Sequence, residues 1–395
     1  MDNTQKYFIH LLSSYLNNSP PLPDAQADWM GVFKLGELHN VTAMLCISIR
    51  KLPAESKPPA KIMGYFNQAL GMTLQSYESK AEGIKLLTDA LNENNIPHMF
   101  VKGAAIRQLY PYGEVRTSGD TDVIVKSVHL KIAADILLKQ GFNQTQSSDV
   151  QRVLFYKDEE FEVKTYLDGV NAVCENYFSQ PFDDKSINIS GSTYYLKDTY
   201  HLIYIISHLL RHLTIGGVGI RQLMDVDVLL RNGNVDFKKF CDIVNQLGIL
   251  RSSMVLISLA KEYFNTPIEA EYKVDEELKN SLETVMLSGG VFGYAISDHG
   301  TGRLVKSINS SNNKGKKSSF KALFMMIFPS KEYLYNTYKY SGKCHLLMPV
   351  AFFHRLFDAV FKRGKSNRKA VKNLFENNET AIMISDIINE LNIEL

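Results

Sequence analysis

The sequence contains only four cysteines, Cys46, Cys174, Cys241 and Cys344, and none of them forms a CxxC or zinc-finger pattern. This scarcity argues against a disulfide framework and a cysteine-based metal site, and it is typical of a reducing compartment. A basic N-terminal segment followed by an apolar run is also missing, as is any apolar stretch approaching the ~20 residues that span a bilayer. We therefore expect a cytoplasmic protein that does not act at a membrane.

No charge of one sign dominates the chain. It has 44 Lys and Arg against 42 Asp and Glu, and its net charge is +2. This balance argues against long nucleic acid as a partner, because such binding depends on a strongly basic surface. The hydrophobic content of 45% is ordinary for a globular protein, and 395 residues exceed what one hydrophobic core usually supports.

Along the chain, a helical pattern is followed by a mixed α/β pattern and then by a second helical stretch. We expect an α+β protein in which a small mixed sheet with helices is flanked by helical N- and C-terminal regions. The expected divisions are an N-terminal helical region (1–95), an α/β core (96–170), a helical region packing on the core (171–305), a basic polar loop (306–321) and a C-terminal helical region (322–395).

Apolar periodicity and Gly or Pro breaks predict the elements within these divisions. The expected strands cover 96–101, 120–125, 153–156 and 161–166, the last two as a hairpin. The expected helices cover 35–51, 60–94, 103–110, 128–140, 199–213, 220–230 and, as one or two helices, 237–264.

Two aspartates one residue apart, Asp120 and Asp122, begin one of the expected strands. Side chains at i and i+2 of a strand point to the same face, so both carboxylates would meet at one place. Two negative charges at such a short distance favour a bound cation. Their hard oxygen ligands suit Mg²⁺ or Mn²⁺. The simpler interpretation is a solvated strand start or an Asx turn after Gly119.

A third carboxylate from a neighbouring strand would complete a metal site, and Glu162 is the best candidate. It alternates with Phe161 and Val163 on an expected strand, whereas Glu160 and Asp158 are weaker alternatives near the turn. An exposed glutamate paired with Lys164 would also explain Glu162.

Lys102 and Gly103 follow the first expected strand. A glycine there allows backbone amides to approach phosphate, although Lys102 is also explained as a solvated strand end. Together with the acids, this pair indicates a metal-dependent phosphoryl or nucleotidyl transfer site.

The run Lys102-Gly103, Arg116, Asp120-Thr-Asp122 and Glu162-Val-Lys164 resembles nucleotidyltransferase family 5, whose members are uncharacterised bacterial nucleotidyltransferases of the DNA polymerase β-like superfamily. The resemblance implies that Asp120, Asp122 and Glu162 are catalytic and bind the metal. It also implies that nucleotide binding involves Lys102, Gly103, Ala104 and Arg116.

The chain departs from the wider pattern at two of these positions. Ala104 stands where the superfamily prefers serine, which removes a hydroxyl from the phosphate site, and Lys164 stands where the family often has histidine.

Four further residues are candidates for an acceptor pocket: Lys164, His208, His212 and Arg221. The two histidines share a helix face at i,i+4, which permits zinc, but no third ligand is evident, and packing or hydrogen bonding is the favoured alternative. For Arg221 the alternative is a helix ion pair with Asp225.

The expected activity is Mg²⁺- or Mn²⁺-dependent transfer of a nucleoside monophosphate from an NTP, with ATP favoured, to an unidentified acceptor hydroxyl on a protein side chain, a small molecule or a sugar. Pyrophosphate would be released. One alternative is a catalytically silent nucleotidyltransferase fold acting as a binding or antitoxin-like interaction protein. Another is a kinase-like phosphotransferase, which would release a nucleoside diphosphate.

Overall fold

The computed structural model describes residues 1–215, 218–269, 274–290, 350, 354, 378–391 and 393. The chain divides into two compact units. The first comprises Met1–Arg211, Gly219–Val291 and Leu391–Leu395, and the second comprises His212–Val218 and Phe292–Glu390. The expected basic loop at 306–321 and most of the expected C-terminal region at 322–395 lie outside the described residues, so the five-part division stays a prediction.

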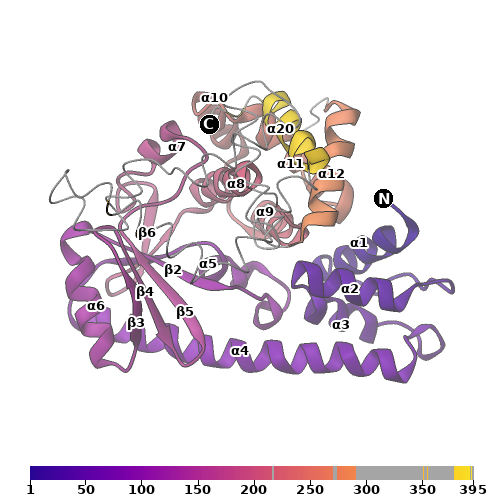
Figure 1. Ribbon diagram of the computed structural model, residues 1–395, viewed down its shortest axis with the longest axis horizontal. Coiled ribbons are helices and arrows are strands. Elements are labelled where there is room, and N and C mark those ends of the chain that lie inside the picture. Colours follow the sequence, from indigo (N-terminus) through magenta and orange to yellow (C-terminus); the bar gives the residue numbers. More distant parts are fainter. Residues whose placement is uncertain are drawn as a thin grey trace. The chain divides into compact units, whose positions relative to one another are not determined.

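A seven-stranded mixed sheet forms the centre of the first unit (Figure 1). Its strand order is β3-β4-β5-β2-β1-β7-β6; the β2–β5 and β1–β7 pairs are parallel and the other pairs antiparallel. The strands are β1 (His98–Phe100), β2 (Asp120–Val125), β3 (Asn143–Ser147), β4 (Gln151–Tyr156), β5 (Glu159–Lys164), β6 (Ser186–Ser190) and β7 (Thr193–Leu196). The prediction of an α+β protein with a mixed sheet is confirmed.

The helices precede, interrupt and follow this sheet along the chain. They are α1 (Asn3–Leu16), α2 (Trp29–His39), α3 (Thr42–Arg50), α4 (Ala60–Glu93), α5 (Gly103–Ile106), α6 (Leu130–Lys139), α7 (Ala172–Tyr177), α8 (Asp198–Ile215), α9 (Ile220–Asn232), α10 (Phe237–Gln246), α11 (Leu250–Phe264), α12 (Glu276–Gly289) and α20 (Asn378–Glu390). No helix in these described ranges combines the length and the apolar character needed to cross a bilayer.

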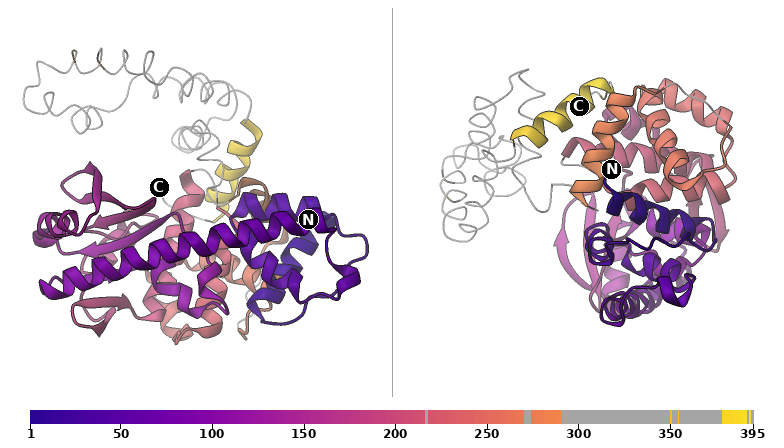
Figure 2. Two further views of the ribbon diagram at one scale, coloured as in Figure 1. Left: turned by 90° about the horizontal axis from the view of Figure 1, so that it is seen from below. Right: turned by 90° about the vertical axis from the view of Figure 1, so that its right-hand side faces the viewer.

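Two of the expected helices differ from the structure. The single helix expected over 35–51 is wrong, because Asn40 adopts a left-handed conformation that ends α2 before α3 begins. The expected helix 103–110 is also too long, since α5 has four residues and a 3₁₀ turn at Arg107–Leu109 follows it. In contrast, α4 continues for 34 residues. Figure 2 shows it as one long helix.

Helices α4 and α6 pack on one face of the sheet (Figure 1). The core of this layer contains Leu87 and Leu91 of α4 together with Val123, Phe161 and Val163 of the central strands. Side chains alternate between the two faces along a strand. The residues adjacent in sequence to these core residues of the strands therefore point to the opposite face. That opposite face carries Asp120 and Asp122 of β2 and Glu160 and Glu162 of β5.

Candidate active site

Three carboxylates meet on the two parallel central strands. In the register between β2 and β5, Asp120 pairs with Glu160 and Asp122 with Glu162. One carboxylate oxygen from each of Asp120, Asp122 and Glu162 lies within 4.8 Å of the others. In the described part of the chain, no other group of acids, histidines and cysteines has the proximity to hold a metal ion. The structure therefore brings together the three acids that the sequence singled out.

Two lysines neutralise the middle carboxylate of this cluster. Asp122 is only 3% exposed, and its two oxygens lie 2.8 Å from the Nζ atom of Lys102 and 2.9 Å from that of Lys164. Burial alone would raise the pKa of Asp122, but the two ammonium groups lower it by more, so this residue is ionised at neutral pH. Lys164 also forms an ion pair with Glu162. The ion pair of Glu162 with Lys164, which was the alternative explanation of this glutamate, is therefore present, and it lies within the acid cluster.

The backbone at Lys102 is held in an unusual conformation. Its φ is +53°, which side-chain-bearing residues rarely adopt, and its N–H donates to His201 Nε2 at 3.1 Å. Burial lowers the pKa of His201 to about 4, so the ring is neutral at pH 7 and can accept this hydrogen bond. The arrangement directs the Lys102 side chain to Asp122. A direct contact of Lys102 with a nucleotide stays a prediction.

Arg116 has a buried carboxylate partner, and its contact with phosphate stays a prediction. Its Nη2 and Nε atoms lie 2.5 Å and 3.1 Å from the two oxygens of Asp225, to which Tyr110 also donates at 2.6 Å. The expected helix ion pair of Asp225 with Arg221 is wrong, because Arg221 donates to Thr117 Oγ1. Arg116 and Asp225 are 109 residues apart in sequence, so this pair could not be inferred from helical spacing.

Gly103 is required by this buried arginine. A Cβ atom at position 103 would lie 2.2 Å from Arg116 Nη1 and 2.9 Å from its Cζ atom. The arginine cannot move away without losing its bidentate contact with Asp225. The glycine therefore has a packing role in addition to any approach of its backbone to phosphate.

We expect Gly103→Ala to destabilise the protein by about 1–3 kcal/mol, because the added methyl group overpacks a buried ion pair. The matched control is Gly71→Ala in α4, where a Cβ atom would meet nothing within 4 Å. That control should stabilise the protein by about 0.5–1 kcal/mol through helix propensity. Urea denaturation of both variants measures the difference, and equal effects would contradict the close approach of Arg116.

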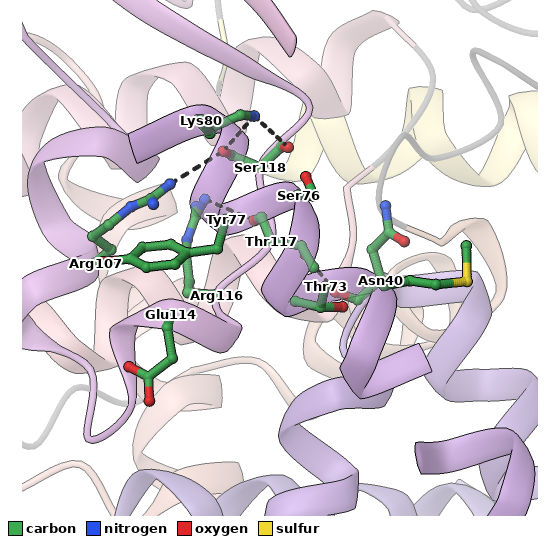
Figure 3. Close-up of a pocket in the computed structure, with 11 residues that line it drawn as sticks. Asn40, Thr73, Ser76, Tyr77, Lys80, Arg107, Glu114, Arg116, Thr117 and Ser118 are labelled. Carbon is green, nitrogen blue, oxygen red and sulfur yellow. Dashed lines mark hydrogen bonds between the residues drawn. The ribbon is translucent and has the colours of Figure 1, made fainter. Parts of the chain in front are cut away.

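A polar pocket of ≈ 240 Å³ lies beside the loop that precedes β2, the strand that carries the aspartates (Figure 3). Its walls come from α4 and from the loop that leads into β2, and its lining residues include Tyr77, Lys80, Arg107, Arg116 and Ser118. Ser118 lies only two residues before Asp120, so the pocket and the acid cluster are neighbours along the chain.

Positive charge in this pocket is only partly compensated. Lys80 donates to the backbone oxygens of Ser118 and Gly119 at 2.9 and 3.1 Å and forms an ion pair with Glu159 at 3.1 Å. In contrast, none of the ion pairs among the described residues involves Arg107, whose guanidinium lies 5.3 Å from the centre of the Tyr77 ring. Burial and the nearby Arg116 lower the pKa of Arg107 to about 10, so it remains charged at pH 7. Such a charge favours an anionic ligand.

Lys80 and Arg107 were not predicted as site residues from the sequence. Lys80 lies on the same helical stripe as Gly83 and Leu87 of α4, which face the sheet, and a lysine on such a stripe is a usable signal. Arg107 follows Gly103 at i+4 across α5 and the 3₁₀ turn, but its exposure to the pocket depends on the loop before β2.

The remaining predicted site residues occupy separate places. Ala104 is half-buried in α5, while His208 lies on α8 with its ring 5.9 Å from that of Tyr204. Within the described residues, neither His208 nor His212 belongs to a cluster able to hold a metal. A role in an acceptor pocket stays a prediction for both histidines and for Arg221.

A family model described as an uncharacterised nucleotidyltransferase matches residues 25–265. The match covers more than half of the chain and includes the acid cluster and the polar pocket. The chain matches no curated protein.

Proposed function

The chain belongs to this family of uncharacterised nucleotidyltransferases, and from that premise we propose that it transfers a nucleoside monophosphate from an NTP to an acceptor hydroxyl. The observation that carries the proposal is the convergence of Asp120, Asp122 and Glu162 within 4.8 Å on two adjacent strands.

The acid cluster has the chemistry of a site for a hard divalent cation. All three donors are carboxylates, which suit Mg²⁺ or Mn²⁺ better than a soft metal, and they come from rigid strands. A cation bound there would neutralise the charge that develops on the reacting phosphate. Asp120, Asp122 and Glu162 are the residues that would hold it.

The polar pocket would receive the phosphates of the nucleotide beyond the reacting one. Arg107 supplies a guanidinium without a carboxylate partner among the described residues, and the Ser118 hydroxyl supplies a hydrogen-bonding group. In the proposed reaction, the acceptor oxygen forms a bond to the α-phosphorus, and the bond from that phosphorus to the β-phosphate oxygen breaks. Pyrophosphate leaves with both remaining phosphates, and the proton of the acceptor hydroxyl passes to solvent water.

The acceptor is proposed to be a protein side chain, a small molecule or a sugar, and ATP the preferred donor. The pocket is polar and small, and the chain has no strong net charge that would attract a long polyanion.

We expect Arg107→Ala to weaken NTP binding about 10- to 100-fold, because a charge-assisted hydrogen bond contributes about 1.5–3 kcal/mol. Arg251→Ala, which removes an exposed arginine of α11, is the matched control and should leave the affinity unchanged. Calorimetric titration with a non-hydrolysable ATP analogue and Mg²⁺ provides the measurement. Equal affinities of the two variants would remove Arg107 from the nucleotide site.

The reaction itself is tested by incubating the protein with each of the four NTPs labelled at the α-phosphate, together with Mg²⁺ and candidate acceptor fractions. The proposal predicts transfer of the label to an acceptor and release of pyrophosphate. Transfer from a γ-labelled NTP with release of a nucleoside diphosphate would indicate a phosphotransferase. Metal-dependent NTP binding without transfer to any acceptor fraction would favour a catalytically silent binding protein.

A further inference from the structure

A positive charge of the chain itself already occupies the position between Asp122 and Glu162. Lys164 follows Glu162 by two residues on β5, so its side chain lies on the same face of the sheet. Its Nζ atom is 2.9 Å from Asp122 Oδ1 and forms a second ion pair with Glu162. The other oxygen of Asp122 is 2.8 Å from Lys102 Nζ. Both oxygens of the central carboxylate therefore have ammonium partners.

An ammonium group and a metal ion cannot share this position. A Mg²⁺ ion bridging Asp122 Oδ1 and Glu162 would lie about 2.0–2.1 Å from both oxygens. Lys164 Nζ contacts the same two residues, so a bridging ion would meet the ammonium at short range and be repelled by its charge.

The other side of the cluster differs from this one. Asp120 belongs to the same group of three acids, but it takes part in none of the ion pairs among the described residues. It is also less buried than Asp122. A cation therefore has access to the carboxylate of Asp120.

We infer that the site takes one divalent cation, where two-metal transferases take two, and that Lys164 supplies the second positive charge. The inference rests on the proposed function, because it concerns the same acid cluster. A two-metal site places its ions about 3.5–4 Å apart, on the attacking and leaving sides of the phosphate. In this chain one of those two charges would be a permanent part of β5.

The number of bound ions tests this inference. Titration of the full-length protein with Mn²⁺ alone, followed by electron paramagnetic resonance of the free ion, should give one bound Mn²⁺ per chain. Lys164→Met vacates the position and should bind two, whereas Lys164→Arg keeps the positive charge and should bind one. As a second readout, Mn²⁺ should raise the unfolding temperature of Lys164→Met more than that of the wild type.

The outcomes separate this inference from the proposed function. Two ions in the wild type would overturn the inference and leave the proposed metal site intact. A single ion in a Lys164→Met variant with wild-type circular dichroism would also overturn it. No bound Mn²⁺ in the wild type would contradict the proposed function itself. The wild-type count is decisive even if Lys164→Met fails to fold.

Discussion

Asp120→Asn should reduce the rate of nucleotidyl transfer about 10²- to 10³-fold while leaving the fold intact. Among the three acids, Asp120 makes no ion pair with a lysine in the described structure, so its charge is the one most available to a cation. Stabilisation of phosphate charge by a metal contributes several kcal/mol, and each 1.36 kcal/mol corresponds to about a tenfold change in rate. Pyrophosphate release at saturating NTP and Mg²⁺ measures the effect.

The control is Asp158→Asn, which makes the same chemical change in the exposed turn between β4 and β5. It should retain wild-type activity, since Asp158 lies outside the acid cluster. Urea denaturation of both variants should give free energies of unfolding within about 0.5 kcal/mol of the wild type, because both substitutions keep the shape of the side chain and neither breaks an ion pair of the described residues. An active Asp120→Asn variant would contradict the assignment of this residue to the metal site.

Asp225→Ala should destabilise the protein by about 3–5 kcal/mol, the largest effect on stability that we expect. The Arg116 and Asp225 side chains are each 5% exposed, and removal of the carboxylate would leave a buried guanidinium without its counter-charge. The Tyr110 hydroxyl would lose its acceptor in the same step. Urea denaturation gives the change in free energy of unfolding.

The contrasting case is the ion pair of Lys85 and Asp89, whose side chains are 76% and 52% exposed. Asp89→Ala should leave the free energy of unfolding close to that of the wild type, because solvent screens an exposed helix pair. The double variant Arg116→Met/Asp225→Leu should be more stable than Asp225→Ala, since no buried charge is left unpaired. If Asp225→Ala costs no more than Asp89→Ala, the buried pair does not stabilise the fold.

The sequence was most informative where the pattern is local. Alternation along a strand placed Asp120 and Asp122 on one face. The same rule on β5 placed Glu162 on the other face of the sheet from Phe161. The edge strands were missed for the same physical reason. β3 is entirely exposed, so its sequence has no apolar alternation from which a strand could be recognised.

Long-range contacts could not be read from spacing. Asp225, the partner of Arg116, lies 109 residues away on α9. Lys80, which donates to Ser118 in the loop before β2, comes from α4. Lys164 illustrates a further limit, because its position after Glu162 was evident but its contact with Asp122 depends on the pairing of β5 with β2. Local periodicity therefore predicts the acids, and tertiary structure determines their counter-charges.

The most direct test of the proposed site is a crystal structure with Mn²⁺ and a non-hydrolysable NTP, with anomalous scattering used to locate the metal. We expect one manganese peak among Asp120, Asp122 and Glu162, with the triphosphate extending toward Arg107 and Ser118. Manganese and nucleotide bound together at a site that excludes these three carboxylates would contradict the account.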